Sequence, residues 1–304
     1  MHGIYSALAL QENIAVDFVD EDGMAEAATL AEFTTLFLTQ PNIPAGTVAP
    51  LVAWVKAGGT LVTTSNAAHW DEYDEPLAAL QQALGIDEAP RNRTLFGTGT
   101  FAYAHSGGAA LQKNGSTADG SGHFEAWGAT SAPSTAATGK VTAHFGDGSP
   151  ATVESTVGEG RAVHFYWLPG VSHSAGGGGG PETGASANAV RETIGEMLAD
   201  TTRKSSSGNQ NLRHGAGGAV AAVDVSEKWV EAPLLVDEAG GAVVTLLNWR
   251  GKPLPQLRVN VSGLGFTPSK VESVLHGALT PTSDGEGLTV SVPLESADFL
   301  LLHK

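Results

Sequence analysis

The sequence contains no cysteine among its 304 residues. This absence excludes disulfide bonds, thiolate metal ligands and a cysteine nucleophile together. Basic residues are also scarce, because 16 Lys and Arg face 32 Asp and Glu and give a formal net charge of −16. Nucleic acids and anionic membranes need clustered cations that neutralise phosphate, so neither is an expected partner.

Long hydrophobic runs are missing as well. No apolar stretch reaches the roughly 18 residues of a membrane-spanning helix, and the N-terminus lacks the basic and apolar segments of a secretory signal. We therefore expect a soluble protein and assign it no compartment. Hydrophobic residues make up 41% of the chain and charged residues 16%, which is typical of a folded protein with a sizeable core.

Motifs for metals and cofactors are absent too. The ten histidines form no His-Glu-x-x-His motif and no tight cluster. Glycine pairs such as Gly97 and Gly99 are too common to indicate a phosphate-binding loop. The sequence therefore predicts neither a metal site nor a cofactor.

Helix and strand patterns alternate in the first part of the chain. Apolar residues at helical spacing predict helices at 3–10 and 46–56. Short apolar runs predict strands at 14–19, 35–39 and 60–64, the last two of the buried, parallel-sheet kind. A parallel α/β domain normally starts with a strand, so the helix-first order indicates either an atypical start or a chain cut from a longer one.

Beyond the first three strands the pattern becomes richer in β-like runs. These further strands are predicted at 94–103, 140–145, 151–157 and 161–167, and a closing helix at 187–198. Together with the alternation before them, they predict a doubly wound, flavodoxin-like α/β domain over residues 1–203.

The polar segment 201–218 is predicted to separate this domain from a second one. After it, short apolar runs are punctuated by Gly, Pro and Asp-Gly turns. They predict seven strands, at 220–225, 229–236, 242–249, 256–261, 271–275, 288–292 and 299–302. Seven short strands in so few residues predict a small antiparallel β-sandwich over 219–304.

Several of these segments resemble a known family. Tyr5–Leu8, Val16–Asp22, Leu36–Pro41, Leu51–Val62, Asp71–Tyr73 and Val157–Val163 resemble the middle, trimerisation domain of family 42 β-galactosidases, which is similar to class I glutamine amidotransferases. Val244–Trp249 and Ala297–Leu302 are similar to the small β domain that follows it in those enzymes. The catalytic (β/α)8 barrel of that family, with its two carboxylates, has no counterpart in the sequence.

The resemblance implies a non-catalytic accessory or oligomerisation region of a glycoside hydrolase. A homo-oligomer, a catalytic-barrel partner and a carbohydrate ligand are the partners it implies. Amidotransferase chemistry itself is excluded, because the nucleophilic cysteine that follows a central strand in that family is replaced by Thr64-Ser65-Asn66.

Two alternatives stay open. The first is a stand-alone serine hydrolase with Ser65 as nucleophile, His69 as base and Asp71 as the acid that orients it, because a serine at the end of a parallel strand is well placed to react. The Gly-x-Ser-x-Gly motif of such enzymes is absent, however. The second is a carbohydrate-binding module whose platform is Trp229 or Trp249.

A ligand site is also predicted at the carboxyl edge of the first sheet, where ligands of open α/β sheets bind. Acidic and aromatic side chains follow the predicted strands there, and their chemistry suits calcium or a polyhydroxylated ligand. The candidates are Asp20, Asp22, Asn66, Trp70, Glu72 and Tyr73. The alternative is a solvated acidic rim that caps the helices following each acidic group.

Overall fold

The computed structural model describes residues 1–12, 14, 16–88, 109–113, 123–126, 131, 133, 139–145, 149–175, 185–202, 222–236, 241–283 and 287–304. Their contacts divide them into two units. One unit takes Met1–Ile4 and the described residues of Phe18–Gly179 and Thr183–Lys204, and the other takes Tyr5–Asp17 and the described residues of Ser205–Lys304. The strand predicted at 94–103 lies outside the described residues.

The first unit is built on a mixed sheet with the strand order β1-β2-β7-β6-β5-β3-β4. Strands β1 (Thr35–Leu38), β2 (Thr60–Thr64) and β7 (Gly160–Phe165) pair in parallel. Antiparallel pairs extend the sheet through β6 (Pro150–Val157), β5 (Lys140–Phe145), β3 (Ala109–Lys113) and β4 (His123–Ala126). The predicted combination of helices with parallel strands is therefore confirmed.

Burial along the parallel strands follows their place in the sheet. All five residues of β2 are buried, as expected of a central strand that is covered on both faces. Strand β1 is only half-buried except at Leu38, because it stands at the end of the strand order. The prediction of a fully buried strand at 35–39 was wrong in this respect.

The strand predicted at 14–19 is also not formed, since none of its described residues lies in a strand. Helix α1 (His2–Tyr5) passes into the π-helical turn η1 (Ser6–Gln11), and the amide of Ile14 donates to the carbonyl of Leu8 over 2.9 Å. An apolar run becomes a strand only where a neighbour satisfies its backbone groups. Here the amide of Ile14 bonds to a carbonyl of the preceding turn η1 instead of to a neighbouring strand.

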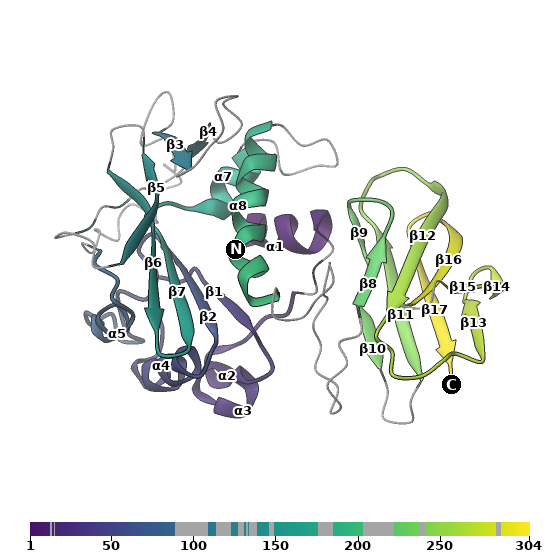
Figure 1. Ribbon diagram of the computed structural model, residues 1–304, viewed down its shortest axis with the longest axis horizontal. Helices are drawn as coiled ribbons and strands as arrows, with labels where there is room; N and C mark the ends of the chain where they lie inside the picture. Colours follow the sequence, from purple (N-terminus) through teal and green to yellow (C-terminus); the bar gives the residue numbers. More distant parts are fainter. Residues whose placement is uncertain are drawn as a thin grey trace. The chain divides into compact units, whose positions relative to one another are not determined.

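Helices cover both faces of the first sheet, as Figure 1 shows. On one face, Leu51 and Val55 of α4 (Val48–Lys56) share a hydrophobic cluster with Ala162 of β7. On the other, Arg161 donates to the carbonyl of Met197 in α8 (Ala185–Thr202). Adjacent strand residues point to opposite faces, so β7 separates these two helical layers. The remaining helices are α2 (Glu21–Ala25), α3 (Ala27–Leu30), η2 (Ala45–Thr47), α5 (Ala79–Leu84) and α7 (Pro169–His173).

Glycines permit the close contact between α4 and the β6–β7 hairpin. A Cβ on Gly160 would lie 1.9 Å from the carbonyl oxygen of Val55, and one on Gly158, whose φ is +64°, would lie 2.7 Å from that of Lys56. The Glu159 amide between them donates to the Lys56 carbonyl over 2.9 Å. The hairpin therefore caps the end of α4, whose last carbonyls have no partner within the helix.

The second unit contains two antiparallel sheets. One has the order β10-β11-β17-β13-β14, with β9 also paired to β11, and the other has the order β15-β16-β12-β8. Their strands are β8 (Ala222–Val225), β9 (Val230–Glu231), β10 (Leu234–Val236), β11 (Ala242–Asn248), β12 (Leu254–Ser262), β13 (Lys270–Ser273), β14 (Gly277–Leu279), β15 (Thr282–Ser283), β16 (Gly287–Leu294) and β17 (Ala297–His303).

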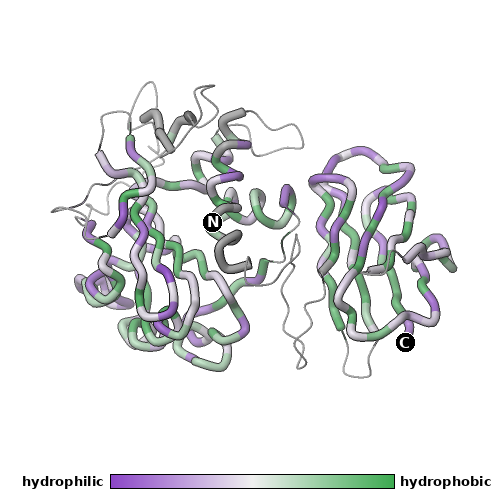
Figure 2. The backbone as a smooth tube through the Cα atoms, in the orientation of Figure 1, coloured by the Kyte–Doolittle hydropathy of each residue, from purple (hydrophilic) through white to green (hydrophobic). Residues whose placement is uncertain are grey.

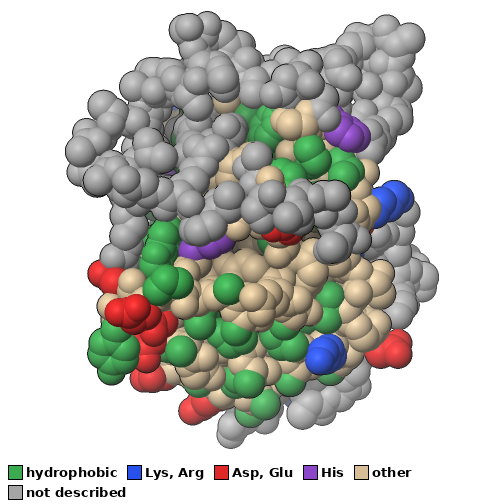
Figure 3. All heavy atoms as spheres, turned by 90° about the vertical axis from the view of Figure 1, so that its left-hand side faces the viewer, with side chains coloured by type: hydrophobic (Ala, Val, Ile, Leu, Met, Phe, Trp, Pro, Cys, Tyr) green, Lys and Arg blue, Asp and Glu red, His purple; other side chains and the backbone are tan. Residues whose placement is uncertain are grey.

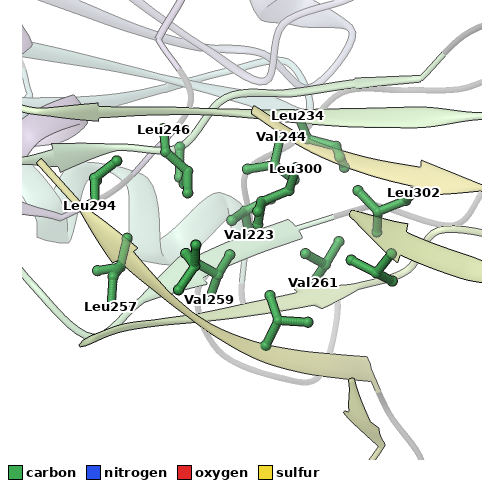
Figure 4. Packing of buried hydrophobic residues seen from close by; sticks show 14 of the residues in the cluster. Val223, Leu234, Val244, Leu246, Leu257, Val259, Val261, Leu294, Leu300 and Leu302 are labelled. Carbon is green, nitrogen blue, oxygen red and sulfur yellow. The ribbon is translucent and has the colours of Figure 1, made fainter. Parts of the chain in front are cut away.

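One hydrophobic core joins the two sheets of this unit. Val244 and Leu300 of the first sheet and Val259 of the second belong to the same buried cluster, and Figure 4 shows them between the sheets. Figure 2 shows hydrophobic residues recurring along these strands. Every run predicted in this region contains a strand, although the run at 229–236 is divided into β9 and β10 around Pro233, which lacks an amide donor. None of the described helices is long and apolar enough to cross a membrane.

Candidate functional site

The first candidate site is a sharp turn, the elbow, formed by residues 64–67 where β2 ends. Asn66 has a φ of 67°, and the amide of Ala67 donates to the carbonyl of Thr64 over 2.9 Å. Asparagine tolerates this left-handed region better than most residues. Ser65, whose amide donates to the carbonyl of Trp167, is 2% exposed and Asn66 is 1% exposed. Both predicted residues therefore lie at the strand end, but their side chains are buried.

A glutamate that the sequence analysis missed, Glu88, occupies the elbow. Its carboxylate accepts the amide of Asn66 at both oxygens, over 2.9 and 3.1 Å. The same carboxylate lies 2.7 Å from Nε2 of His69 and 3.5 Å from Nε2 of His164. The side chain of Glu88 is 0% exposed. Two histidines and a backbone amide therefore surround a carboxylate that water does not reach.

The sheet fixes the position of His164. His164 on β7 is paired with Thr63 on β2 in the parallel register, and Thr63 Oγ1 lies 2.8 Å from its Nδ1. The ring of Tyr166, two residues further along the chain, packs edge-on against it at 4.6 Å. The phenol of Tyr166 donates to the carbonyl of Asp87 over 2.8 Å and so holds the segment that carries Glu88.

The surroundings of Glu88 keep it ionised. Burial by itself raises the pKa of a carboxyl group. In Glu88, the interactions with His164 and His69 outweigh burial and hold the pKa far below its usual range. Burial raises the pKa of Tyr166 above its usual range, and the charges of Glu88 and Asp87 raise it further. Glu88 is thus a negative charge and Tyr166 a neutral donor at all physiological pH values.

The structure does not join the three predicted catalytic residues into a triad. Ser65 Oγ is buried and has no hydrogen-bond partner among the residues that the structure describes. His69 bonds to Glu88, and Asp71 Oδ1 accepts the amides of Tyr73 and Glu75 over 2.8 and 2.9 Å. A serine nucleophile needs a base in contact with its hydroxyl. The described geometry supplies a carboxylate and a histidine but no contact to Ser65.

The predicted ligand residues near Asp71 stabilise a loop. Glu72 Oε2 accepts the amide of Ala45 over 2.8 Å at the start of η2, the turn that leads into α4. The Trp70 amide donates to the Pro41 carbonyl, and its ring is part-buried. The Tyr73 side chain is 79% exposed. The alternative prediction places such carboxylates at the start of the following helix, whereas Glu72 bonds to the start of η2, which precedes it in the chain.

The other predicted acidic group lies on α2. Asp20 is its N-cap and accepts the amide of Gly23 over 2.8 Å, and Asp22 is an exposed residue of its first turn. Figure 3 shows several acidic side chains together at the lower left of the visible face and others elsewhere on it, with basic side chains scattered singly. Asp20 therefore also caps a helix.

The described residues include no group of three His, Cys, Asp or Glu side chains that could hold a metal ion. Glu88 and His69 illustrate the reason. Zinc ligands each lie about 2 Å from the ion, so two ligand atoms are further apart than the two atoms of a hydrogen bond. The 2.7 Å between these two side chains is a direct hydrogen bond.

In the second unit, the two tryptophans predicted as sugar platforms differ. Trp229 is 6% exposed, with a φ of 64°, and so cannot stack on a ligand as it stands. Trp249 is 55% exposed, and its indole donates to Glu231 Oε2 over 2.6 Å. That bond fixes the orientation of the exposed ring.

Comparison with known proteins supports the fold of the whole chain. No family model matches the sequence, and no curated protein matches it. Among solved structures, a β-galactosidase from Bacillus circulans sp. alkalophilus is 15% identical with a TM-score of 0.60, and covers 99% of this chain and 37% of its own. Gan42B, a GH42 β-galactosidase from G. stearothermophilus, is 14% identical with a TM-score of 0.60 and corresponding coverages of 99% and 36%.

A different glycosidase has a similar region. The α-L-fucosidase isoenzyme 2 from Paenibacillus thiaminolyticus is 14% identical with a TM-score of 0.57, over 99% of this chain and 44% of that one. The chain thus spans between a third and a half of the length of these proteins. At such identities the comparison establishes a shared fold and no activity.

Proposed function

We propose that this chain is a non-catalytic region of a family 42-type, β-galactosidase-like glycoside hydrolase. It would consist of a doubly wound, amidotransferase-like domain over 1–203 and a β-sandwich over 219–304. Support comes from the shared fold, which extends over 99% of this chain but only 36–37% of the β-galactosidases. The expected roles are to adjoin a catalytic-barrel partner, to form homo-oligomers or to contact carbohydrate.

The observation that carries the proposal is the closed elbow. Acyl-transfer enzymes use backbone amides near such a turn to stabilise a developing oxyanion. Here the amide of Asn66 is already bonded to the carboxylate of Glu88. A second negative charge at this position would be repelled by the first. The amide at the elbow is therefore already occupied by a carboxylate of the chain itself.

The test is turnover of an aryl β-galactoside by the purified 304-residue chain. We expect no hydrolysis above that of a heat-denatured sample, because the proposal places the catalytic carboxylates in a barrel partner and not in this chain. Hydrolysis that stays with the protein through successive chromatography steps and saturates with substrate would refute the proposal.

A second candidate function, a carbohydrate-binding module, is favoured by one observation. Trp249 exposes a ring whose orientation is fixed by Glu231, and aromatic rings of this kind stack on sugars. Titration with galacto-oligosaccharides would then quench tryptophan fluorescence in the wild type but not in Trp249→Ala. Unchanged wild-type fluorescence at saturating sugar counts against this function.

A further inference from the structure

The β15-β16-β12-β8 sheet, whose strands are labelled in Figure 1, carries a groove on its outer face. Buried and more exposed residues alternate along β16, so one set of side chains enters the core and the other faces outward. The groove has a volume of about 540 Å³, which lies in the range of small-ligand sites. All of its lining residues are polar, and they include Asp224, Ser226, Arg258, Asn260, Thr282 and Thr289.

Four of these residues form a row across the sheet. Thr282 is paired with Thr289, which is paired with Asn260 on the next strand. Asn260 is in turn paired with Asp224 on β8, the last strand of the sheet. Neighbouring strands lie about 4.8 Å apart, so the row spans about 14 Å. It therefore presents two hydroxyls, an amide and a carboxylate in a line that is longer than one sugar ring.

Hydrogen bonds within the face hold part of this row in place. Asn260 Nδ2 donates to Thr289 Oγ1 over 2.9 Å, and Thr282 Oγ1 donates to the Thr289 carbonyl over 3.3 Å. The first of these bonds fixes the orientation of the Asn260 amide, whose Oδ1 accepts no hydrogen bond from any described residue. An acceptor that is already held in position binds a ligand at a lower cost in conformational entropy.

Two opposite charges lie in the groove without neutralising each other. Asp224 is paired with Asn260, two residues from Arg258 on the same strand, so the charged side chains are diagonal neighbours. Both are exposed, and neither has an ion-pair partner among the described residues. A glutamate lies within ion-pair distance of each of the other described arginines, Arg161, Arg191 and Arg250. Arg258 and Asp224 therefore keep their hydrogen-bonding groups available to a ligand.

This combination of groups matches a neutral ligand with many hydroxyls. A sugar hydroxyl both donates and accepts hydrogen bonds, so a line of mixed donors and acceptors can bond to successive hydroxyls. The guanidinium of Arg258 only donates and the carboxylate of Asp224 only accepts, and each has the geometry to bond two adjacent hydroxyls. Their charges cancel, so the groove favours an ion of neither sign. A hydrophobic ligand would find no apolar lining residue.

We infer that this groove binds a neutral oligosaccharide across the four strands. A short peptide is a poorer match, because its ammonium and carboxylate groups would occupy Asp224 and Arg258 and leave the Asn260 amide and the threonine hydroxyls unused. The inference is independent of the proposed function, since a chain that hydrolysed a substrate could bind sugar in the same groove. It is also independent of the Trp249 platform, which uses none of these residues.

Titration of the full chain with neutral trisaccharides, followed by saturation-transfer difference NMR, tests the inference. The probes are maltotriose, cellotriose and β-1,4-galactotriose, which differ in the orientation of their hydroxyls. We expect at least one of them to bind at millimolar concentrations, with an affinity that changes little as salt is raised, because the ligand is uncharged. Arg258→Gln and Asp224→Asn should each weaken binding at least about tenfold, because each removes hydrogen bonds to a charged group.

Gln256→Ala and Trp249→Ala are the matched controls and should bind as tightly as the wild type. Gln256 is exposed on β12 but lies outside the groove, and Trp249 follows β11 of the other sheet. Circular dichroism checks that every variant is folded, and the two groove variants test the inference separately if one of them is not. Failure of all three sugars to bind overturns the inference. So does binding that both groove variants leave intact, binding that Trp249→Ala abolishes, or binding of glycylglycine in place of the sugars.

Discussion

Glu88 illustrates how a single buried charge can both close a site and stabilise it. Its carboxylate is 0% exposed and receives one backbone amide and two histidine rings. A buried charge is tolerated only when hydrogen bonds replace the water it loses. Asn66, His69 and His164 supply these interactions from three places in the chain, so the cluster ties the elbow to β7.

Removing that carboxylate is the first prediction. Glu88→Ala leaves His69, His164 and the Asn66 amide without their common partner, and should lower the free energy of unfolding by about 3–5 kcal/mol. Urea denaturation measures the change. The control is Glu32→Ala, an exposed glutamate whose loss should cost at most about 0.5 kcal/mol. Equal effects of the two substitutions would contradict the role given to Glu88.

Ser65 leads to the opposite expectation. Its buried hydroxyl has no hydrogen-bond partner among the described residues, so it is desolvated without compensation. Ser65→Ala should therefore leave the free energy of unfolding unchanged or raise it by up to about 1 kcal/mol. Thermal unfolding followed by circular dichroism measures this. A clear loss of stability would indicate that the hydroxyl has a partner, and would again favour the hypothesis that Ser65 is a nucleophile.

The acid stability of the protein should depend on His173. Burial, and then the charge of His2, lower the pKa of His173 to about 4. Since the unfolded chain takes up this proton near pH 6.5 and the folded chain only near pH 4, stability is lost as the pH falls through that window. Glu88 adds a second loss below about pH 4.3, because its folded pKa is depressed and its ionised form is the stabilising one.

Unfolding free energies measured between pH 7.5 and 4.5 check this prediction. His173→Gln, which does not titrate, should remove on the order of 2 kcal/mol of the decline in that range. A decline of the same size in the wild type and the variant would show that His173 is not responsible.

At the scale of elements, the sequence predicts regular structure best where local chemistry decides it. The run at 60–64 is continuously apolar or β-branched and forms the buried strand β2. The run at 14–19 looks similar but forms no strand in its described part. A strand also needs a neighbouring strand to pair with, and the residues of the run do not determine whether one is present. Strand β9 is separated from β10 for a local reason, which is Pro233.

The contact between α4 and the β6–β7 hairpin supplies a prediction for elements. Gly160→Ala brings a Cβ to 1.9 Å from the carbonyl oxygen of Val55, so the hairpin or the helix must move. We expect a loss of about 3 kcal/mol or more, measured by urea denaturation. Gly195→Ala in α8 meets nothing within 4 Å and should instead stabilise by up to about 1 kcal/mol. Equal losses in both variants would contradict the close contact.

The candidate site was predictable in part. Ser65, Asn66 and His69 lie at the end of β2, where the sequence places them, because a strand followed by polar residues indicates a sheet edge. The acidic partner of His69 was not predictable. Asp71 stands two residues away in sequence, whereas Glu88 stands nineteen residues away, beyond α5. His164 reaches the same carboxylate only through the pairing of β7 with β2, which no local pattern specifies.

At the scale of the whole molecule, the two units defined by contacts between residues do not follow the order of the residues along the chain. The sequence predicts a first domain over 1–203, whereas contacts group Tyr5–Asp17 with the strands of the second unit. The amide of Trp229 donates to the carbonyl of Leu10 over 2.5 Å within that unit. Such long-range pairing depends on the folded arrangement and leaves no trace in local periodicity. The chain shares its fold with glycosidases of which it spans only 36–37% of the length.

The central claim is that the elbow is closed and carries no nucleophile. Its most direct test is reaction of the folded chain with a fluorophosphonate, which labels activated serines, followed by intact-mass spectrometry. The account predicts no adduct on the wild type, because Ser65 Oγ is buried and no described base contacts it. A stoichiometric adduct that maps to Ser65 and disappears in Ser65→Ala would contradict the account.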